Sequence, residues 1–379
     1  MTTSQVTALR RKDTASAGDL YMSFELGDKH WKLSIGDGRS AVCRFNVHAG
    51  DQTAVAQCIV RAGNRFKTPK HARVHSCYEA GRDGWWLHRW LTGMGVDNVV
   101  VDAASIEVNR RARRAKTDRL DADKLEAMLE RHHRGERVWA VLHEPSEHDE
   151  DERREHRELE RLIHERTAHN NRIGSLLVLH NLRPSVHIAG RGWADWWRLH
   201  REQLGRKLGA EIDRELARLQ LVKEQVREIE AARRAELQHG RQPLVDQLMR
   251  LCGIGISGAS VLVHEIFGWR HFANRRELAG CLGLTPTPYA SGDSQTEQGI
   301  SKAGNRRARS LLVEISWGWL RLQPDSAISC WFNKRFARSS ARMRRVGIVA
   351  VARRLAVALW RLLRDGELPA GARPKAIAA

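Results

Sequence analysis

The order of strands and helices in the first third of the chain constrains its fold more than any other feature. Three short apolar runs, separated by the turn sequences GDK and GDGR, predict an antiparallel meander. A helix, a fourth strand, a tryptophan-rich helix and a fifth strand follow. The five predicted strands cover residues 21–27, 30–35, 40–47, 72–80 and 97–104. This order predicts a ribonuclease H-like domain, a mixed α/β sheet with helices on its faces.

Acidic residues fall where these elements end or begin. Glu25 ends the first strand, Glu79 ends the fourth, and a later helix opens with Asp118 and Asp121 on one face. Strand ends and helix starts at one sheet edge can assemble a site from distant residues. Such carboxylates repel one another unless a divalent cation lies between them, and Mg²⁺ prefers oxygen ligands. We therefore predict two Mg²⁺ ions, about 3.5 to 4 Å apart, that serve phosphoryl transfer on DNA.

Each acid also has a plain structural interpretation. Asp118 and Asp121 could cap their helix and favour its positive dipole end. Glu79 could be an ordinary charge at a strand end. Asp28, three residues after Glu25, is an alternative first ligand. Taken together in one fold order, the acids favour the catalytic interpretation.

Basic residues outnumber acidic ones, and the excess is concentrated near the end of the chain. The 64 Lys and Arg residues against 45 Asp and Glu give a formal net charge of +19. Residues 301–379 alone hold 17 basic residues and 4 acids. Such a chain suits a polyanionic partner, and the local excess favours a binding surface over a general aid to solubility.

Two basic segments are predicted to contact the backbone of nucleic acid. The run RRARRAK, directly before the helix acids, comprises Arg110, Arg111, Arg113, Arg114 and Lys116. The segment NKRFARSSARMRR, between two arginine-edged apolar helices, includes Lys334 and Arg335. A solvated basic face is the alternative for the second segment, but its concentration of charge argues against that.

The six cysteines form no CxxC pair and have no regular spacing, so neither a disulfide framework nor a zinc finger is expected. This usage favours a reduced, cytoplasmic setting. No signal-peptide core is visible near the N-terminus. The apolar run 346–352 is well short of the roughly 20 residues that a membrane span needs, so no membrane association is expected.

The region from about residue 145 to 241 is rich in Glu, Arg, His and Leu. Apolar residues spaced three, four and seven apart from Leu204 to Ile229 predict a long helix, and another covers roughly 149–180. We expect an antiparallel coiled-coil hairpin, or pairing with another subunit, in a structural role. Three histidines lack the spacing of a metal site and are predicted at the surface: His156, His164 and His169.

A third region begins near residue 242 and is expected to be helical. Gly253 and Gly255 lie between a short helix and an apolar helix, as in a helix-hairpin-helix element, whose backbone amides can hold a DNA phosphate. A single GxG motif does not separate this role from that of a tight packing turn.

A polar loop is predicted after residue 283. Ser291 is a candidate nucleophile there, with Ser294 as an alternative in the same loop. The phosphate-binding cations predicted beside it are Lys302, Arg306, Arg307 and Arg309. Taken alone, a serine in a loop favours ordinary turn chemistry.

Four motifs together carry a resemblance to a known family: FELGDKHWKL, YEAGRDGWWLHRWL, KTDRLDADKL and GLTPTPYASGDSQTEQGISKAGNRRAR. In this order, across nearly the whole chain, they resemble the transposases of the insertion sequence (IS) 110/1111 family. The resemblance implies a RuvC-like domain with a DEDD acidic set, a coiled-coil region and a C-terminal transposase domain with an essential serine. Glu79, Asp118 and Asp121 take the second to fourth acidic positions, and Ser291 takes the serine position. Glu25 aligns with the first position, which is usually Asp.

The resemblance also implies a mechanism and a set of partners. Members of that family move DNA through a circular intermediate, guided by a non-coding bridge RNA that pairs with donor and target DNA. The serine forms a covalent link to a DNA phosphate, assisted by Mg²⁺ at the acidic set, and the two halves of the site come from different subunits of a tetramer. The expected setting is the bacterial cytoplasm, in association with the nucleoid.

The expected domains are a flexible N-terminus (1–19), the RuvC-like domain (20–144), the coiled-coil region (145–241), the C-terminal transposase domain (242–366) and a flexible tail (367–379). Two rival functions stay open at this point. One is a RuvC-like junction nuclease that uses water, with Ser291 only structural. The other is a nucleic-acid-binding protein without enzymatic activity, in which the acids are helix caps.

Overall fold

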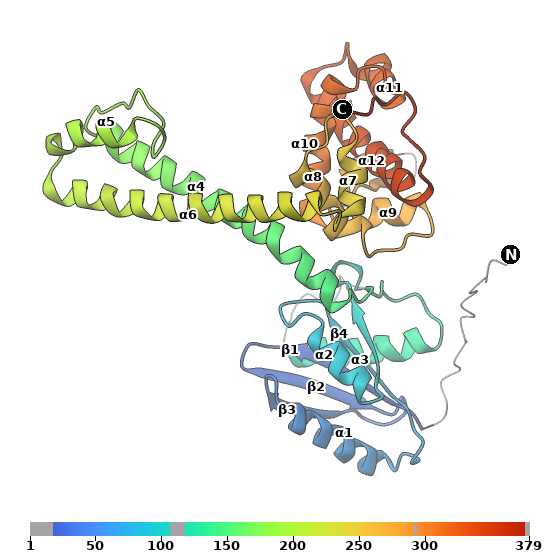
Figure 1. The fold of residues 1–379 in the computed structure, drawn as a ribbon. Helices are drawn as coiled ribbons and strands as arrows, with labels where there is room; N and C mark the ends of the chain where they lie inside the picture. The colour runs from blue at the N-terminus through green and yellow to red at the C-terminus, as the bar shows by residue number, and fades with distance from the viewer. Residues whose placement is uncertain (1–17, 107–117, 292–293, 376–379) are drawn as a thin grey trace. The chain divides into compact units, whose positions relative to one another are not determined.

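The structure is a computed structural model that describes residues 18–106, 118–291 and 294–375 (Figure 1). It consists of two compact units, residues 1–144 and 145–379. The basic run from Arg110 to Lys116 lies outside the described residues. No helix of the described chain is long and apolar enough to cross a membrane.

The first unit is built on a five-stranded mixed sheet with the order β3-β2-β1-β4-β5. The strands are β1 (Leu20–Leu26), β2 (His30–Gly36), β3 (Cys43–His48), β4 (Val74–Glu79) and β5 (Asp97–Val101). β1, β2 and β3 form an antiparallel meander, whereas β4 pairs in parallel with β1 and with β5. Polar turns close the meander: Asp37 Oδ1, for example, accepts hydrogen bonds from the backbone N–H groups of Arg39 and Ser40. The predicted mixed sheet is therefore confirmed.

Helices cover both faces of this sheet, and the two faces have separate cores. The helices are α1 (Gln52–Phe66), α2 (Trp86–Gly93) and α3 (Asp118–His133). Met22 and Phe24 of β1 belong to the core that includes residues of α1 and α2. Tyr21 belongs to the other core, with Leu125 and Leu129 of α3. Successive strand residues thus alternate between the two cores, as a pleated strand requires.

Two long helices begin the second unit, α4 (Glu147–Val178) and α6 (Arg206–Gln238), with the short α5 (Trp193–His200) between them. Ser146 and Asp149 form a capping box at the start of α4. α4 and α6 lie side by side (Figure 1), and their buried apolar residues form two shared clusters. Leu159 and Leu162, early in α4, pack with Val222 and Val226, late in α6, so the helices run antiparallel.

The rest of this unit is a helical core with one β-hairpin. Its elements are α7 (Pro243–Met249), α8 (Ile256–Leu262), the π-helical turn η3 (Val263–Phe267), α9 (Arg275–Cys281), β6 (Pro286–Ser291), β7 (Ser294–Ile300), α10 (Arg306–Leu322), α11 (Ala327–Phe336) and α12 (Ala341–Asp365). Buried side chains from α7, α8, α9, α10 and α12, such as Leu248, Leu278, Trp319 and Leu359, form its core together with residues of η3.

One sequence prediction is wrong in this region. The segment predicted as a polar loop after residue 283 contains two antiparallel strands, β6 and β7. Thr and Tyr favour strands, and only two residues separate β6 from β7. Residues near the end of the described chain, within the expected flexible tail, contact the helical core. The Lys375 backbone N–H donates to the Arg250 carbonyl at 2.6 Å, and Leu251 forms a β-bridge with Pro374.

Candidate functional site

The carboxyl ends of β1 and β4 bring two of the predicted acids together. Phe24 pairs with Tyr78 in these parallel strands, so the next residues, Glu25 and Glu79, stand beside each other on neighbouring strands. Glu79 is exposed and Glu25 is half-buried. Two like charges therefore lie at one edge of the sheet.

Both glutamates share the face of the sheet that α3 covers. Two residues before Glu25, the Ser23 hydroxyl donates to the Ala122 carbonyl at 2.6 Å. Two residues before Glu79, the Cys77 thiol lies 3.7 Å from the Leu125 carbonyl. Because side chains two apart share a strand face, both glutamates lie on the α3 side.

The direction of α3 brings its own acids to the same edge. Ala122, near the helix start, contacts Ser23 in the middle of β1, whereas the His133 ring, at the helix end, lies 5.8 Å from the Tyr21 ring, nearer the start of β1. α3 therefore runs antiparallel to β1, and its first turn lies at the carboxyl ends of the strands. Asp118 and Asp121 occupy this turn. Asp121 is half-buried, and the Asp118 side chain lies outside the described residues.

The described acids are near one edge without being closely gathered. No three oxygen atoms from Glu25, Glu79 and Asp121 lie within 4.8 Å of one another among the described side chains. Asp28, the alternative first ligand, lies in the turn after β1 and pairs with Arg82 at 2.6 Å, with both side chains largely exposed. Its position in the turn, beyond the end of β1, favours Glu25 over Asp28 at the sheet edge.

Another acid of α3, Glu126, lies buried against the sheet and was not predicted as a site residue from the sequence. Glu126 is 4% exposed, its Oε1 has no hydrogen-bond partner among the described residues, and a Cβ at Gly36 would overlap its carboxylate. Burial raises the pKa of Glu126 to about 8, and the carboxylates of Glu130 and Asp123 add to the rise. No local pattern distinguishes Glu126 from the surface acids of this helix.

We expect Glu126→Gln to stabilise the chain above neutral pH. The pKa of this carboxyl is 4.5 ordinarily and about 8 in the folded chain, so the free energy of unfolding falls as the pH rises through that interval. At pH 8 the variant should gain about 1 to 2 kcal/mol, because its buried amide still lacks a partner. Urea unfolding at pH 5 and pH 8 measures this gain. Glu158→Gln, at an exposed position of α4, is the control, and an equal gain at both pH values would contradict the assignment.

The candidate nucleophile is the last residue of a strand. Ser291 ends β6 and pairs with Ser294, the first residue of β7. The side chains of both serines and the connection 292–293 lie outside the described residues. The structure thus replaces the predicted loop by two paired strands, and the two candidate serines form the last pair of their ladder.

The four cations predicted near this hairpin fall into two pairs. Lys302 and Arg306 are exposed, and neither has a carboxylate partner in the described part of the chain. Arg307 instead pairs with Glu160 of α4, and its Nη1 lies 3.6 Å from Oε1 of Glu265 in η3. Arg309 donates to the Leu282 carbonyl at 2.9 Å. The second pair therefore has structural partners that the sequence did not reveal.

The Gly253–Gly255 turn joins α7 to α8, as predicted, and it is packed. Gly253 has a φ of +94°, which favours glycine, and Gly255 precedes α8 as its N-cap. The carbonyls on either side of Gly253 accept hydrogen bonds from Gln323 and Lys375. These contacts support the packing role and leave phosphate binding a prediction.

An exposed basic surface covers the end of α11 and the start of α12. It consists of six cations without a carboxylate partner among the described residues: Lys334, Arg335, Arg338, Arg342, Arg344 and Arg345. The two helices cross closely at Gly347, where a Cβ would come within 2.8 Å of the Phe336 ring. Six exposed cations without carboxylate partners in the described chain make this surface suitable for binding a polyanion.

A buried carboxylate ties α4 to the C-terminal helices. The Glu265 side chain, in η3, is 1% exposed and accepts hydrogen bonds from Arg157 at 2.8 and 3.0 Å and from Asn305 at 2.8 Å. His156 Nε2 lies 2.8 Å from the same carboxylate, so the prediction that His156 is a surface residue is wrong. Burial alone raises the pKa of Glu265, but His156 and Arg157 hold it well below its usual range.

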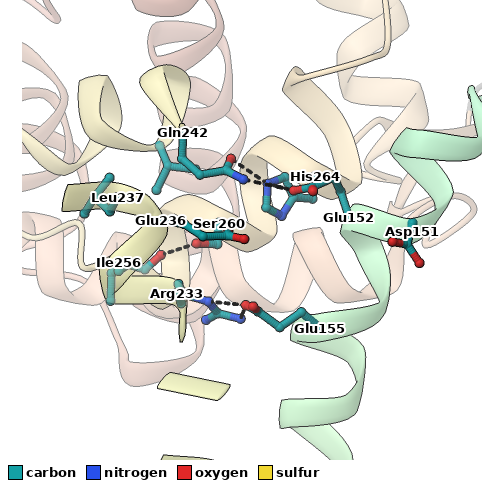
Figure 2. Close-up of a pocket in the computed structure, with 11 residues that line it drawn as sticks. Asp151, Glu152, Glu155, Arg233, Glu236, Leu237, Gln242, Ile256, Ser260 and His264 are labelled. Atoms are coloured by element: carbon teal, nitrogen blue, oxygen red, sulfur yellow. Dashed lines mark hydrogen bonds and ion pairs between the residues drawn. The ribbon is translucent and has the colours of Figure 1, made fainter. Parts of the chain in front are cut away.

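A polar cavity of about 180 Å³ lies beside this cluster, between α4, α6, α7 and α8 (Figure 2). Several of its polar side chains pair with one another. Arg233 pairs with Glu155 at 2.7 Å, and Gln242 bonds both Glu152 and His264. None of the predicted site residues lines it, so we regard the cavity as part of the packing between these helices.

Comparison with known proteins agrees with the motifs. The sequence model of the Transposase IS116/IS110/IS902 family matches residues 245–329. The chain is 37% identical over 389 residues to a putative transposase of Sinorhizobium fredii, and the match covers 94% of each chain. It is 29% identical over 147 residues to a transposase for the insertion sequence element IS1328 of Yersinia enterocolitica, covering 38% of this chain and 42% of that protein.

A shorter match links the chain to the element after which the family is named. An insertion element IS110 protein of Streptomyces coelicolor is 28% identical over 158 residues, which cover 40% of this chain and 38% of that protein. The resemblance seen in the four motifs is thus confirmed. The chain belongs to the IS116/IS110/IS902 family of transposases.

Proposed function

We propose that this transposase excises and inserts its element by cleaving and joining DNA strands at an acidic site formed by Glu25, Glu79, Asp118 and Asp121. The observation that carries the proposal is their placement. Two acids end neighbouring parallel strands, and the other two open the helix whose first turn lies at the same edge. The sheet order and the parallel β4 and β5 support a ribonuclease H-like, RuvC-like fold for residues 20–144.

The donor set fits Mg²⁺. All four side chains offer carboxylate oxygens, the ligands that Mg²⁺ prefers, and their mutual repulsion favours a divalent cation between them. Bound Mg²⁺, as one or two ions, would stabilise negative charge on the phosphate oxygens. The chain's own contribution is to fix the acids on a strand edge and a helix end, which are rigid elements.

We assign the nucleophile to Ser291. Its hydroxyl oxygen would bond to the DNA phosphorus while a DNA oxygen leaves, which gives a covalent link that a second strand can displace. Lys302 and Arg306, both exposed, could hold the phosphate there. Ser291 and the acids belong to different units of the chain. The proposed assembly is a tetramer in which these two parts come from different subunits, with α4 and α6 as a coiled-coil contact.

The proposed partners are the element ends, the target DNA and a bridge RNA that selects them. The six-cation surface on α11 and α12 supports contact with a nucleic-acid backbone. An RNA guide would supply sequence recognition by base pairing, so that the protein needs few contacts to base edges. The basic run from Arg110 to Lys116, directly before α3, is the proposed clamp near the acids.

Covalent trapping tests the proposal. We expect wild-type chain, Mg²⁺, element-end DNA and RNA transcribed from the element's flanks to give a protein–DNA adduct on denaturing gels. Ser291→Ala should form none, whereas the control Ser294→Ala, which changes the cross-strand neighbour, should retain it. Omission of the RNA should also abolish the adduct.

Other outcomes would favour the rival functions. An adduct with Ser291→Ala would reject this serine as the nucleophile. Strand cleavage that persists without an adduct in Ser291→Ala, and vanishes in Asp121→Asn, would indicate a junction nuclease that uses water. Binding without any strand breakage in Mg²⁺ would indicate a nucleic-acid-binding protein.

A further inference from the structure

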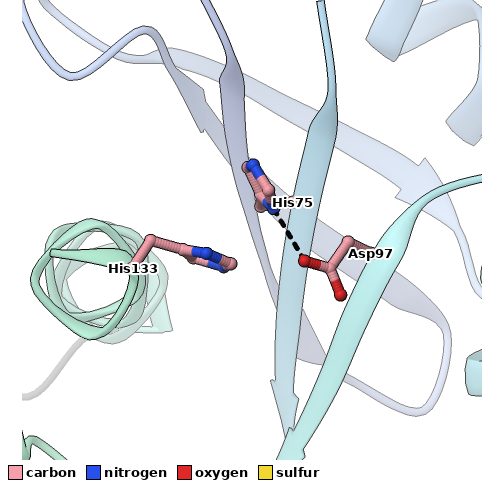
Figure 3. Close-up of side chains that lie close together, drawn as sticks. All are labelled: His75, Asp97 and His133. Atoms are coloured by element: carbon pink, nitrogen blue, oxygen red, sulfur yellow. Dashed lines mark hydrogen bonds and ion pairs between the residues drawn. The ribbon is translucent and has the colours of Figure 1, made fainter. Parts of the chain in front are cut away.

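A second group of ligand-type side chains lies at the opposite edge of the sheet, where β4 and β5 begin (Figure 3). His75 is the second residue of β4, Asp97 is the first of β5, and His133 is the last of α3. One nitrogen or carboxylate oxygen from each lies within 4.8 Å of the others. In the described chain, no other three His, Cys, Asp or Glu side chains are gathered so closely.

His75 is buried between two carboxylates. Its Nδ1 lies 2.9 Å from Asp97 Oδ2, and its Nε2 lies 3.4 Å from Asp19 Oδ2. Asp19 is itself buried, and its other oxygen accepts a hydrogen bond from the Arg73 backbone N–H at 3.1 Å. The His75 ring is therefore fixed in orientation from both of its nitrogens.

Hydrogen bonds among the described residues do not account for the position of His133. Its ring centroid lies 3.9 Å from that of His75, and its Nε2 is buried without a hydrogen-bond partner among the described residues. A buried polar atom without a partner costs about 1 to 3 kcal/mol. A chain of hydrogen bonds from Asp19 through His75 to Asp97 leaves this nitrogen unexplained. A cation bound to it would remove the cost.

We propose that His75, Asp97 and His133 form a Zn²⁺ site, with His75 Nδ1, Asp97 Oδ2 and His133 Nε2 as ligands and water in the fourth position. Two imidazoles with one carboxylate suit Zn²⁺, whereas Mg²⁺ prefers oxygen ligands alone. Zinc bonds of about 2.1 Å at tetrahedral angles place ligand atoms about 3.4 Å apart. One ligand atom from each of the three residues lies within 4.8 Å of the others, so small side-chain shifts suffice.

The surroundings favour this site. Asp19, behind His75, occupies the position of the carboxylate that orients a zinc-bound histidine. The Asp97 side chain is 57% exposed, which gives an ion access from solvent.

The site would have a positioning role. It joins the end of α3 to the starts of β4 and β5, and α3 carries Asp118 and Asp121 in its first turn. A bound ion would hold this helix on the sheet while the acids at its other end meet DNA. The proposal concerns different residues and a different metal from the Mg²⁺ site, and it does not depend on that function.

Zinc binding by the full chain tests the proposal without DNA or any activity assay. We expect equilibrium dialysis against about 10 μM Zn²⁺, in an EDTA-free buffer that also contains an excess of Mg²⁺, to load about one tightly held zinc ion per chain. Zn²⁺ should raise the melting temperature by about 5 °C. Co²⁺ in its place should give the visible absorption of a tetrahedral ion.

Variants locate the ion and separate ligands from bystanders. Asp97→Asn, which can still accept from His75, and His133→Gln should each weaken Zn²⁺ binding by at least about 100-fold, and Asp19→Asn by about 10-fold. His71→Ala removes an exposed histidine close to β4 in sequence and should bind Zn²⁺ as wild type does. Circular dichroism identifies any variant that fails to fold. A wild-type chain without a tight ion, or equal binding in the folded Asp97→Asn chain, would overturn the proposal.

Discussion

Replacement of Asp121 by Asn is expected to lower the rate of DNA strand cleavage about a thousandfold without unfolding the chain. The side chain is half-buried in the first turn of α3, at the edge that holds Glu25 and Glu79. Loss of one carboxylate of the proposed Mg²⁺ site would remove several kcal/mol of charge stabilisation, and about 4 kcal/mol corresponds to that change in rate. Glu25→Gln should have an effect of the same size. Single-turnover cleavage of element-end DNA in Mg²⁺ measures both.

Asp28→Asn is the matched control, because it also removes a carboxylate near the end of β1. Asp28 pairs with Arg82 in an exposed turn, so this change should leave the cleavage rate within about threefold of wild type. The reverse result, with Asp28→Asn inactive and Glu25→Gln active, would show that the first acidic ligand is Asp28. Equal melting temperatures for the three variants would exclude misfolding as the cause.

Glu265→Ala is expected to lower the free energy of unfolding by about 3 kcal/mol, the largest stability loss that we expect from a single substitution. The change leaves His156, Arg157 and Asn305 without the buried acceptor that they share. Removal of one partner from a buried ionic cluster typically costs about 3 to 5 kcal/mol. The lower end applies because the Arg157 side chain is 41% exposed and can reach water. Urea unfolding of the full chain, followed by circular dichroism, measures the loss.

The pH dependence distinguishes this cluster from simple packing. Because the folded chain holds the pKa of Glu265 below its ordinary value, the contribution of its charge is complete above about pH 4.5 and is lost as the pH falls further. The deficit of Glu265→Ala should therefore shrink in acid. Glu158→Ala, at an exposed position of α4, should change stability by less than about 0.5 kcal/mol. A deficit that stays constant down to pH 3 would argue against the ionic cluster.

Local patterns were sufficient to predict the sheet and the places of its acids. Alternation and polar turns defined β1, β2 and β3, because strand period and turn chemistry are local properties. The positions of Glu25 and Glu79 at strand ends followed from the same pattern. The hairpin β6–β7 was missed, because its residues also suit a polar loop and only the pairing of the two strands distinguishes them.

Contacts between distant residues could not be predicted in this way. Glu265 meets Arg157 across 108 residues of sequence, and the His75, Asp97 and His133 side chains come from three separate elements. In the sequence these residues look like many other polar residues of the chain. Their roles depend on burial and on partners that only the folded arrangement supplies.

The contact between Arg307 and Glu160 bears on the order in which this protein forms during synthesis. The two residues are separated by 147 positions, so at roughly 5 to 20 residues per second the first half of α4 waits on the order of ten seconds for its partner. α6 emerges sooner and can pair with α4 in the meantime. The waiting stretch is dominated by Glu, Arg and His, which water solvates well, and it offers little apolar surface to neighbouring nascent chains. An ion pair between charged, well-solvated side chains is therefore suited to a contact that forms late during synthesis.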